Sequence, residues 1–199
     1  MNNQPIGILL AAGQSRRFGS DKLLQPLADG TPLVIASAQK LSRVLSDCLA
    51  VVNPATPALL IQQLAQLGYQ IVVNELAETG MGSSIASGVS ASAQATSWIF
   101  ALADMPFIHP DTIKKISDTL LDGAGIAAPV YEQQRGHPVG FAARYRDELL
   151  SLNDDIGARY IIAEHFKDLV TVEVEDRGVI WDIDAVTDLP ATNSQSISL

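Results

Sequence analysis

The sequence predicts a three-layer α/β/α fold built around a mostly parallel sheet. Residues 6–12 (IGILLAA) form a continuous apolar run that ends at Gly13, as expected of a strand buried on both faces of a parallel sheet. Further short apolar runs then alternate with helical patterns at about 25 residues per unit, which is typical of successive βαβ units. The first run is therefore expected to be the central strand.

The next elements follow in order along the chain. Thr31-Pro32 and Thr56-Pro57 each predict the start of a helix, because a cap residue followed by proline favours the first helical turn. The second of these helices is expected to end at Gly68. The remaining predictions for this part are strands at 49–52, 70–73 and 98–103 and helices at about 83–95 and 110–121.

The alternation changes after Gly125. We expect strands near 126–130, 170–174 and 179–183, an extended segment at 135–141, and short helices near 144–152 and 158–165. These elements should extend the same sheet. The chain is thus interpreted as one domain, residues 1–189, with halves at 6–123 and 124–189, followed by a small polar segment, 190–199, that is expected to be a disordered tail.

Composition narrows the function classes. With 199 residues, of which 47% are hydrophobic and 18% charged, the chain can bury a sizeable core. A net charge of -9 argues against a broad nucleic-acid surface. The run at 6–12 is too short to span a membrane and has no basic region before it, so we expect a cytoplasmic protein without a membrane partner. Cys48 is the single cysteine and is expected in the core.

A basic, glycine-containing loop follows the first strand: residues 10–22, LAAGQSRRFGSDK. Small residues let the backbone approach phosphates, and Arg17 and Lys22 supply countercharge for a triphosphate. Five residues separate Gly13 from Gly19, and Lys22 lies too far on for a Walker A loop; the dinucleotide G-x-G-x-x-G fingerprint is also missing. A strand-to-loop turn with solvated basic side chains remains the alternative.

A carboxylate follows another buried run. Asp104 comes directly after residues 98–103 and just before Pro106, which places it at the carboxyl edge of the predicted sheet. Proteins bind Mg²⁺ through only one or two carboxylates, with phosphate oxygens and water completing the shell. Asp104 is therefore a candidate magnesium ligand, and an N-cap for the next helix is the alternative.

The loop resembles the L-A-[AG]-G-x-S-x-R-[FM]-G-x-x-K loop of the molybdenum cofactor nucleotidyltransferases, which belong to the nucleotidyltransferases of Rossmann-like fold. The resemblance implies that the loop holds the phosphates of an NTP and that Arg17, Lys22 and Asp104 are catalytic. L-A-D-M-P at 102–106 resembles the metal motif of the family and implies Asp104 as a Mg²⁺ ligand. The implied nucleotide-binding loop residues are Leu10, Ala11, Ala12, Gly13, Ser15, Arg17, Gly19 and Lys22.

A second carboxylate is implied near the end of the chain. Asp182-Ile183-Asp184 resembles the D-I-D-T-P-E-D-L ending of the family, so Asp184 is the implied second metal ligand and Asp182 its alternative. The two acids are expected on the same side of a strand, two residues apart. This sequence departs from the family pattern directly after Asp184, at residues 185–187 (AVT).

Three further segments carry the resemblance. Residues 80–84 (GMGSS) open a helix, and Gly82, Ser83 and Ser84 are implied nucleoside contacts; a serine N-cap without a ligand is the alternative. Residues 136–139 resemble the G-H-P-V segment at the acceptor pocket, which implies acceptor contacts from His137 and Pro138. Residues 155–159 resemble the G-D-x-G-A-R run, with Asp154 in place of its first glycine, and imply that Gly157 and Arg159 bind the acceptor.

The implied reaction is transfer of CMP from CTP to the terminal phosphate of molybdopterin, with Mg²⁺ as cofactor and pyrophosphate released. The double alanine ending at Ala12 goes with cytidylyl transfer in the resembled family, whereas Leu-Ala-Gly-Gly goes with guanylyl transfer. The product would pass to a molybdoenzyme. The alternatives are guanylyl transfer, a sugar-phosphate or polyol-phosphate acceptor, and a non-catalytic chaperone for the finished cofactor; intact Lys22 and Asp104 argue against the last.

Overall fold

The computed structural model describes residues 4–13, 22–153 and 157–183, and the figures draw the other residues in grey. Five predicted features lie outside the described residues: Ser15, Arg17, Gly19, Asp184 and the polar tail at 190–199.

The strands of the described residues form one eight-stranded sheet in the order β3-β2-β1-β4-β7-β5-β6, and β8 pairs with β5. β1 lies at the centre between two parallel neighbours, β2 and β4, as its apolar run predicts. β7 runs antiparallel between β4 and β5, so the second half of the chain extends the same sheet. The strands are β1 Ile6–Ala11, β2 Cys48–Val52, β3 Gln70–Val73, β4 Ser97–Leu102, β5 Ile126–Tyr131, β6 Gln134–Arg135, β7 Val139–Ala142 and β8 Leu169–Glu173.

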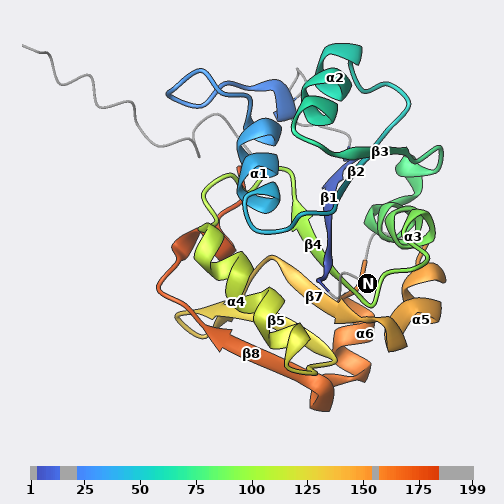
Figure 1. Cartoon of the computed structure of the whole chain (residues 1–199), viewed down its shortest axis with the longest axis vertical. Helices are drawn as coiled ribbons and strands as arrows, with labels where there is room; N and C mark the ends of the chain where they lie inside the picture. The colour runs from blue at the N-terminus through green and yellow to red at the C-terminus, as the bar shows by residue number, and fades with distance from the viewer. Residues whose placement is uncertain (1–3, 14–21, 154–156, 184–199) are drawn as a thin grey trace, which may run out of the picture.

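Helices cover both faces of the sheet, which confirms the three-layer α/β/α prediction (Figure 1). One core cluster contains Leu9 of β1 and the buried sides of α1, α2 and α4; the other contains Ile8 and the buried sides of α3, α5 and α6. No helix in the described ranges is long and apolar enough to cross a membrane. The helices are α1 Leu33–Ser42, α2 Ala58–Gln66, α3 Met81–Ala91, α4 Pro110–Leu121, α5 Arg146–Leu150 and α6 Arg159–Glu164.

The helix starts differ in detail from the prediction. Pro32 and Pro57 were expected at the first helical position, but they occupy the N-cap positions of α1 and α2. Each helix therefore begins one residue later than expected. α3 begins at Met81 rather than near Ser83, and Gly80 is its N-cap. The φ angle of Gly80 is 129°, a conformation that favours glycine, so the chain turns into α3 without a serine cap.

The predicted strand at 179–183 is wrong. Arg177–Ile180 forms a short 3-10 helix, η5, and residues 181–183 pair with no strand. The cause is local, since the Asp176 carboxylate accepts a hydrogen bond from the Gly178 N–H and tightens the chain into a turn. The expectation that Asp182 lies on one face of a strand is therefore also wrong.

Candidate active site

The carboxyl ends of the parallel strands bring distant residues to one edge of the sheet. Ala12 and Gly13 come directly after β1, and Asn53 comes directly after β2. Asp104 is the second residue after the end of β4. The Asn53 amide donates a hydrogen bond to the Ala12 carbonyl over 3.3 Å and so holds the backbone of Ala12 directly after β1. A Cβ at Gly13 would meet no atom within 4 Å, so packing does not require glycine here, and its open backbone suits the approach of a ligand.

Lys22 and Asp104, 82 positions apart, form an ion pair at this edge. Lys22 Nζ lies 2.9 Å from Asp104 Oδ2, and the two side chains are only 11% and 26% exposed. Their attraction is therefore stronger than that of a surface pair. The backbone of Asp104 is also fixed, because its carbonyl accepts a hydrogen bond from the Ile183 N–H over 3.0 Å. The fold thus brings together the predicted cation and the predicted carboxylate.

The free oxygen of Asp104 fits a metal ligand. Asp104 Oδ1 is buried and has no hydrogen-bond partner among the described residues. A buried carboxylate oxygen without a partner is costly, and hard divalent cations such as Mg²⁺ prefer oxygen ligands. The alternative of a helix cap does not apply, because α4 begins at Pro110 with His109 as its N-cap.

Asn74, which the sequence analysis missed, organises the turn between β3 and α3. Its buried amide donates to the hydroxyl oxygens of Ser83 and Ser84 over 2.9 and 3.0 Å. The Ser83 hydroxyl in turn donates to the Leu76 and Gly80 carbonyls. Both serines are buried, so their hydroxyl groups shape this turn, and the nucleoside contacts from Gly82, Ser83 and Ser84 stay predictions. An asparagine directly after a strand was the available signal.

His137 lies two residues before β7, and the charges of two arginines and one acid act on it. Burial, followed by the Arg159 and Arg135 charges, lowers the pKa of His137 from 6.5 to about 4, and the Asp182 charge opposes this shift. His137 Nδ1 is buried without a hydrogen-bond partner among the described residues. Its backbone N–H donates to the Val179 carbonyl, and its peptide bond to Pro138 is cis. The imidazole is therefore neutral near pH 7.

Two of the predicted acceptor residues, His137 and Arg159, come from separate elements and lie within electrostatic reach of each other. His137 and Arg159, which begins α6, are close enough for the charge of one to shift the pKa of the other. Gly157 has a φ of 60° and packs against Met81 and Ile85 of α3. Asp182, the alternative metal ligand, is exposed beside them and directly precedes Ile183, which bonds to Asp104. The short segment formed by Asp182 and Ile183 therefore connects the surroundings of His137 with Asp104.

We expect His137→Gln to flatten the pH dependence of stability. The folded pKa of about 4 lies below the ordinary value of 6.5, so the unfolded chain takes up a proton first as the pH falls. The wild type should lose about 3 kcal/mol of unfolding free energy between pH 6.5 and pH 4, and nothing from this group above pH 6.5. Urea unfolding at pH 7.5, 5.5 and 4 measures the difference, and equal losses in both proteins would contradict the low pKa.

Asp176 anchors the segment that carries Asp182, and sequence reasoning missed it. This buried carboxylate accepts hydrogen bonds from the His109 N–H, the Thr112 hydroxyl and the Gly178 N–H, at 2.8, 2.7 and 3.0 Å. It therefore joins η5 to the start of α4. The only sequence signal was an aspartate two residues before a glycine, which is typical of an Asx turn.

Asp176→Ala is expected to lower the unfolding free energy by about 2 to 5 kcal/mol, because it leaves two buried donors and one partly buried donor without this acceptor. Asp176→Asn keeps the shape of the side chain and one acceptor oxygen, so a smaller loss is expected. Thermal and urea unfolding of the two variants provide the comparison. An alanine variant as stable as the wild type would show that Asp176 does not anchor this segment.

Comparison with known proteins agrees with this geometry. A family model described as the MobA-like NTP transferase domain matches residues 7–169. A probable molybdenum cofactor guanylyltransferase from Thermococcus gammatolerans is 27% identical over 149 residues, covering 72% of this chain and 73% of that protein. A nicotine blue oxidoreductase from Paenarthrobacter nicotinovorans is 27% identical over 189 residues, covering 90% of this chain and 92% of that protein.

The fold also matches a solved structure. Rv0371c from Mycobacterium tuberculosis superposes with a TM-score of 0.81 at 26% identity, over 93% of this chain and 95% of that one. A structure of the same protein in complex with manganese gives a TM-score of 0.77 at 23% identity over the same shares. Since the family model covers most of the chain, the protein belongs to the MobA-like NTP transferase family and is a nucleotidyltransferase of α/β fold.

Proposed function

We propose that the protein transfers CMP from CTP to the terminal phosphate of molybdopterin, with Mg²⁺ as cofactor and pyrophosphate as second product. The observation that carries this proposal is the partly buried Lys22–Asp104 pair, at the edge of the sheet where Ala12 and Gly13 also lie. It supplies a countercharge for a triphosphate and an oxygen ligand for a metal at the edge where α/β sheets bind ligands. In this proposal residues 6–123 bind the nucleotide and residues 124–189 the acceptor.

The reaction is an in-line displacement at the α-phosphorus. Lys22 and Arg17 bind the β- and γ-phosphates and stabilise the charge that builds on the leaving pyrophosphate. Asp104, with Asp184 or Asp182, would hold Mg²⁺, whose charge neutralises phosphate oxygens. The manganese complex of Rv0371c supports a divalent cation in this fold. Lys22 pairs with Asp104 Oδ2, whereas Oδ1 has no hydrogen-bond partner among the described residues. One oxygen of the carboxylate is therefore available to bind a metal.

On the acceptor side, Arg159 and neutral His137 position the terminal phosphate of the acceptor. This phosphate is already anionic, so the attack on the α-phosphorus requires no general base. The low pKa of His137 supports this arrangement, because an uncharged imidazole can orient a polar group of the acceptor substrate without taking its proton. In this proposal His137 therefore orients the acceptor and does not act as a general base.

Three alternatives stand beside this proposal. The Thermococcus gammatolerans relative is named as a guanylyltransferase, and the choice of base rests on Ala12, as tested below. The Paenarthrobacter nicotinovorans relative is named as an oxidoreductase, but the loop after β1 lacks the G-x-G-x-x-G fingerprint of dinucleotide binding. A sugar-phosphate or polyol-phosphate acceptor would share Lys22 and Asp104 and differ around His137 and Arg159.

We expect CTP to give a higher kcat/KM than GTP or ATP, and Ala12→Gly to narrow this preference. Ala12 is buried and its carbonyl is fixed by Asn53, so its methyl group limits the space beside the backbone. One methyl group contributes about 1 to 3 kcal/mol, roughly tenfold to two-hundredfold in kcat/KM. Steady-state rates with each NTP, Mg²⁺ and molybdopterin measure the ratio. A wild-type preference for GTP would reject cytidylyl transfer and leave nucleotidyl transfer in place.

A further inference from the structure

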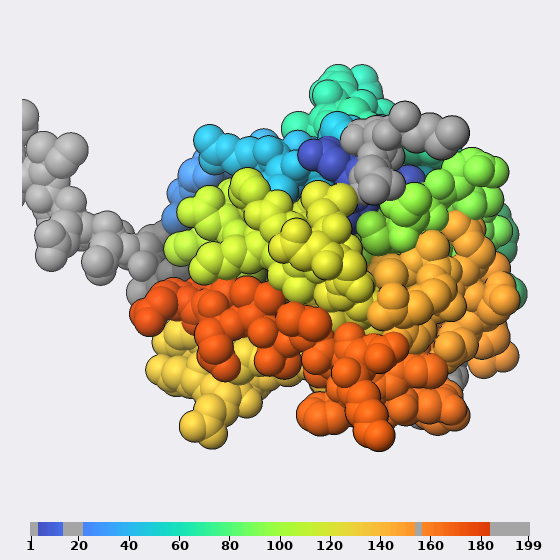
Figure 2. Space-filling model, turned by 60° about the horizontal axis from the view of Figure 1, so that its bottom comes forward, coloured from blue at the N-terminus to red at the C-terminus, as the bar shows by residue number. Residues whose placement is uncertain are grey.

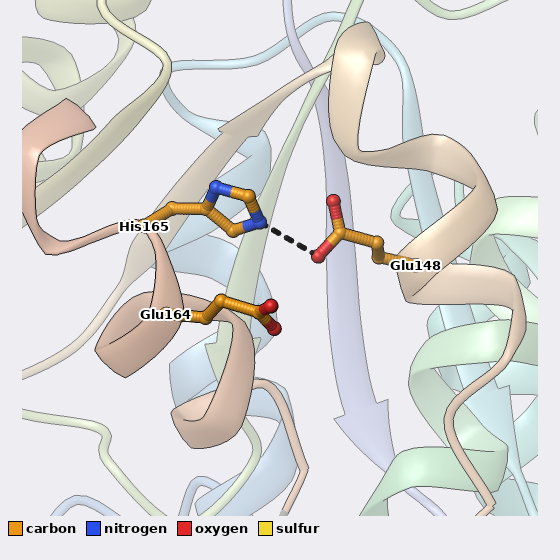
Figure 3. A group of neighbouring side chains, drawn as sticks. All are labelled: Glu148, Glu164 and His165. Atoms are coloured by element: carbon orange, nitrogen blue, oxygen red, sulfur yellow. Dashed lines mark hydrogen bonds and ion pairs between the residues drawn. The ribbon is translucent and has the colours of Figure 1, made fainter.

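Three metal-ligating side chains gather where α5 meets the end of α6, apart from the residues of the proposed reaction. Glu148 comes from α5, and Glu164 and His165 come from the last turn of α6 and the residue after it. One ligand atom from each lies within 4.8 Å of the other two. Figure 3 shows the imidazole and both carboxylates pointing toward one another, and His165 Nε2 lies 2.9 Å from Glu148 Oε2.

The cluster opens into a cavity of about 300 Å³, which gives a small ligand access to it. Figure 2 shows this part of the chain, in orange, gathered into one continuous area of the surface. The cavity is lined by Glu148, Ser151, Leu152, Tyr160, Ile161, Glu164 and His165. All three ligating residues therefore line one accessible space.

The two carboxylates of the cluster, Glu148 and Glu164, have no lysine or arginine as ion-pair partner in the part of the chain that the structure describes. Tyr160 lines the same cavity as Glu164 and adds no positive charge to it. Two carboxylates beside one imidazole carry up to two negative charges, which is the charge that a divalent cation would neutralise.

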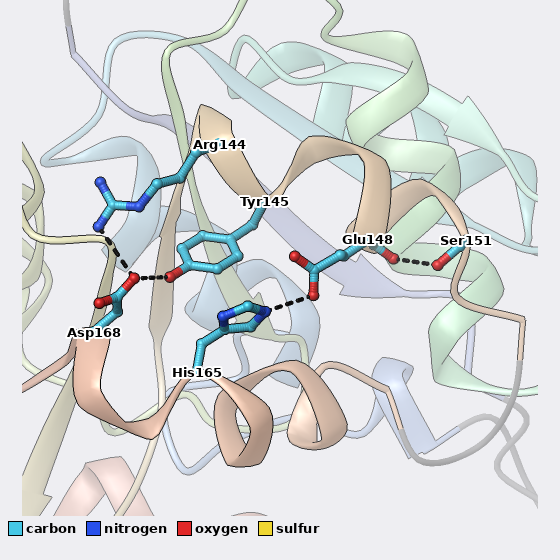
Figure 4. Close-up of polar contacts among 6 residues, drawn as sticks. All are labelled: Arg144, Tyr145, Glu148, Ser151, His165 and Asp168. Carbon is cyan, nitrogen blue, oxygen red and sulfur yellow. Dashed lines mark hydrogen bonds and ion pairs between the residues drawn. The ribbon is translucent and has the colours of Figure 1, made fainter.

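The imidazole of His165 packs against an aromatic ring that is itself held by hydrogen bonding. The Tyr145 ring packs edge-on against His165, with ring centroids 5.0 Å apart. The Tyr145 hydroxyl donates to Asp168 over 2.6 Å, and Arg144 lies 3.7 Å from the same carboxylate (Figure 4). Metal sites depend on such outer contacts, because they fix the orientation of the ligating rings.

From this geometry we propose a Zn²⁺ site formed by His165 Nε2 and one carboxylate oxygen each of Glu148 and Glu164, with water as the fourth ligand. One histidine with two carboxylates is a donor set suited to Zn²⁺. Bonds of about 2.0 to 2.1 Å in a tetrahedron place ligand atoms about 3.4 Å apart, so ligand atoms already within 4.8 Å need only small side-chain movements. The bound ion replaces the His165–Glu148 hydrogen bond and ties α5 to α6.

The test is Zn²⁺ titration of the whole chain in competition with a chromophoric chelator, with Zn²⁺ alone as the probe. The wild type is expected to bind one equivalent at this site. His165→Gln and Glu164→Gln should each weaken binding by at least about tenfold, as loss of a metal-site contact does. Glu164→Gln keeps the His165–Glu148 contact, so a loss of affinity in this variant cannot come from breaking that contact.

Two controls locate the ion. Glu173→Gln makes the same charge change at an exposed residue of β8 and should leave the affinity unchanged. Asp104→Asn removes the carboxylate of the proposed nucleotide site and should leave one equivalent of Zn²⁺ bound. The site is rejected if the wild type binds no Zn²⁺, if both cluster variants bind as tightly as the wild type, or if Asp104→Asn abolishes the bound equivalent. Co²⁺ in place of Zn²⁺ should give tetrahedral visible absorption that His165→Gln loses.

Discussion

Asp104→Ala is expected to lower kcat/KM by at least about a thousandfold, the largest effect of any single change proposed for this chain. Asp104 provides both the partner of Lys22 and the buried Oδ1 that is free to bind a metal. Without it, the metal loses its protein anchor and Lys22 loses the group that holds its ammonium at the edge of the sheet. NTP should still bind weakly, since the loop remains.

The measurements are pyrophosphate release for kcat/KM and calorimetry for NTP affinity. Asp104→Asn is the matched control for shape, and it should be nearly as inactive because an amide oxygen ligates Mg²⁺ more weakly than a carboxylate. Asp182→Ala and Asp184→Ala identify the second ligand, and the prediction is that Asp184→Ala has the larger effect. Activity within tenfold of wild type in Asp104→Ala would remove Asp104 from the mechanism.

Lys22→Ala is expected to reduce kcat/KM by about tenfold to a thousandfold, because a cation is removed from phosphates in a partly desolvated site. The Lys22 side chain is 11% exposed, so water replaces its charge poorly. Arg17→Ala should have a similar effect if Arg17 binds the same triphosphate. The variant also leaves Asp104 unpaired, so the unfolding free energy must be measured beside the rate.

Lys115→Ala is the matched control for Lys22→Ala, because it removes the same charge from an exposed position on α4. Its rate should equal that of the wild type. If Lys22→Ala also retains wild-type turnover, the loop does not bind the triphosphate through this lysine. A loss of turnover with an unchanged unfolding free energy assigns the effect to substrate binding and catalysis.

Local patterns predicted the first half of the fold well. The apolar run ending at Gly13 indicated the central strand, and Asp104 could be placed at the carboxyl edge because it directly follows a buried run. Such features depend on burial and on the spacing of apolar residues, and both can be read from a single segment of the sequence. The pairing of Lys22 with Asp104 was consistent with their implied roles, although no spacing in the sequence predicts their contact.

The second half shows where local patterns fail. The apolar residues at 179–183 look like a strand, but Gly178 packs against the Phe107 carbonyl and Trp181 packs against the Phe107 ring, with centroids 4.8 Å apart. These long-range contacts, together with the turn at Asp176, determine the conformation. In the same way, the antiparallel insertion of β7 between β4 and β5 depends on distant partners. In the first half, the hydrogen bonds from Asn74 to Ser83 and Ser84 likewise could not be predicted from spacing alone.

The protein is proposed to transfer a nucleoside monophosphate to molybdopterin. The most direct test incubates the protein with CTP labelled at the α-phosphate, Mg²⁺ and molybdopterin, and follows both the labelled pterin and pyrophosphate. The wild type is expected to form one labelled CMP–pterin product for each pyrophosphate released, and Asp104→Ala is expected to form neither product. Pyrophosphate release without label on the pterin, or no reaction with any NTP, would contradict the proposed transfer.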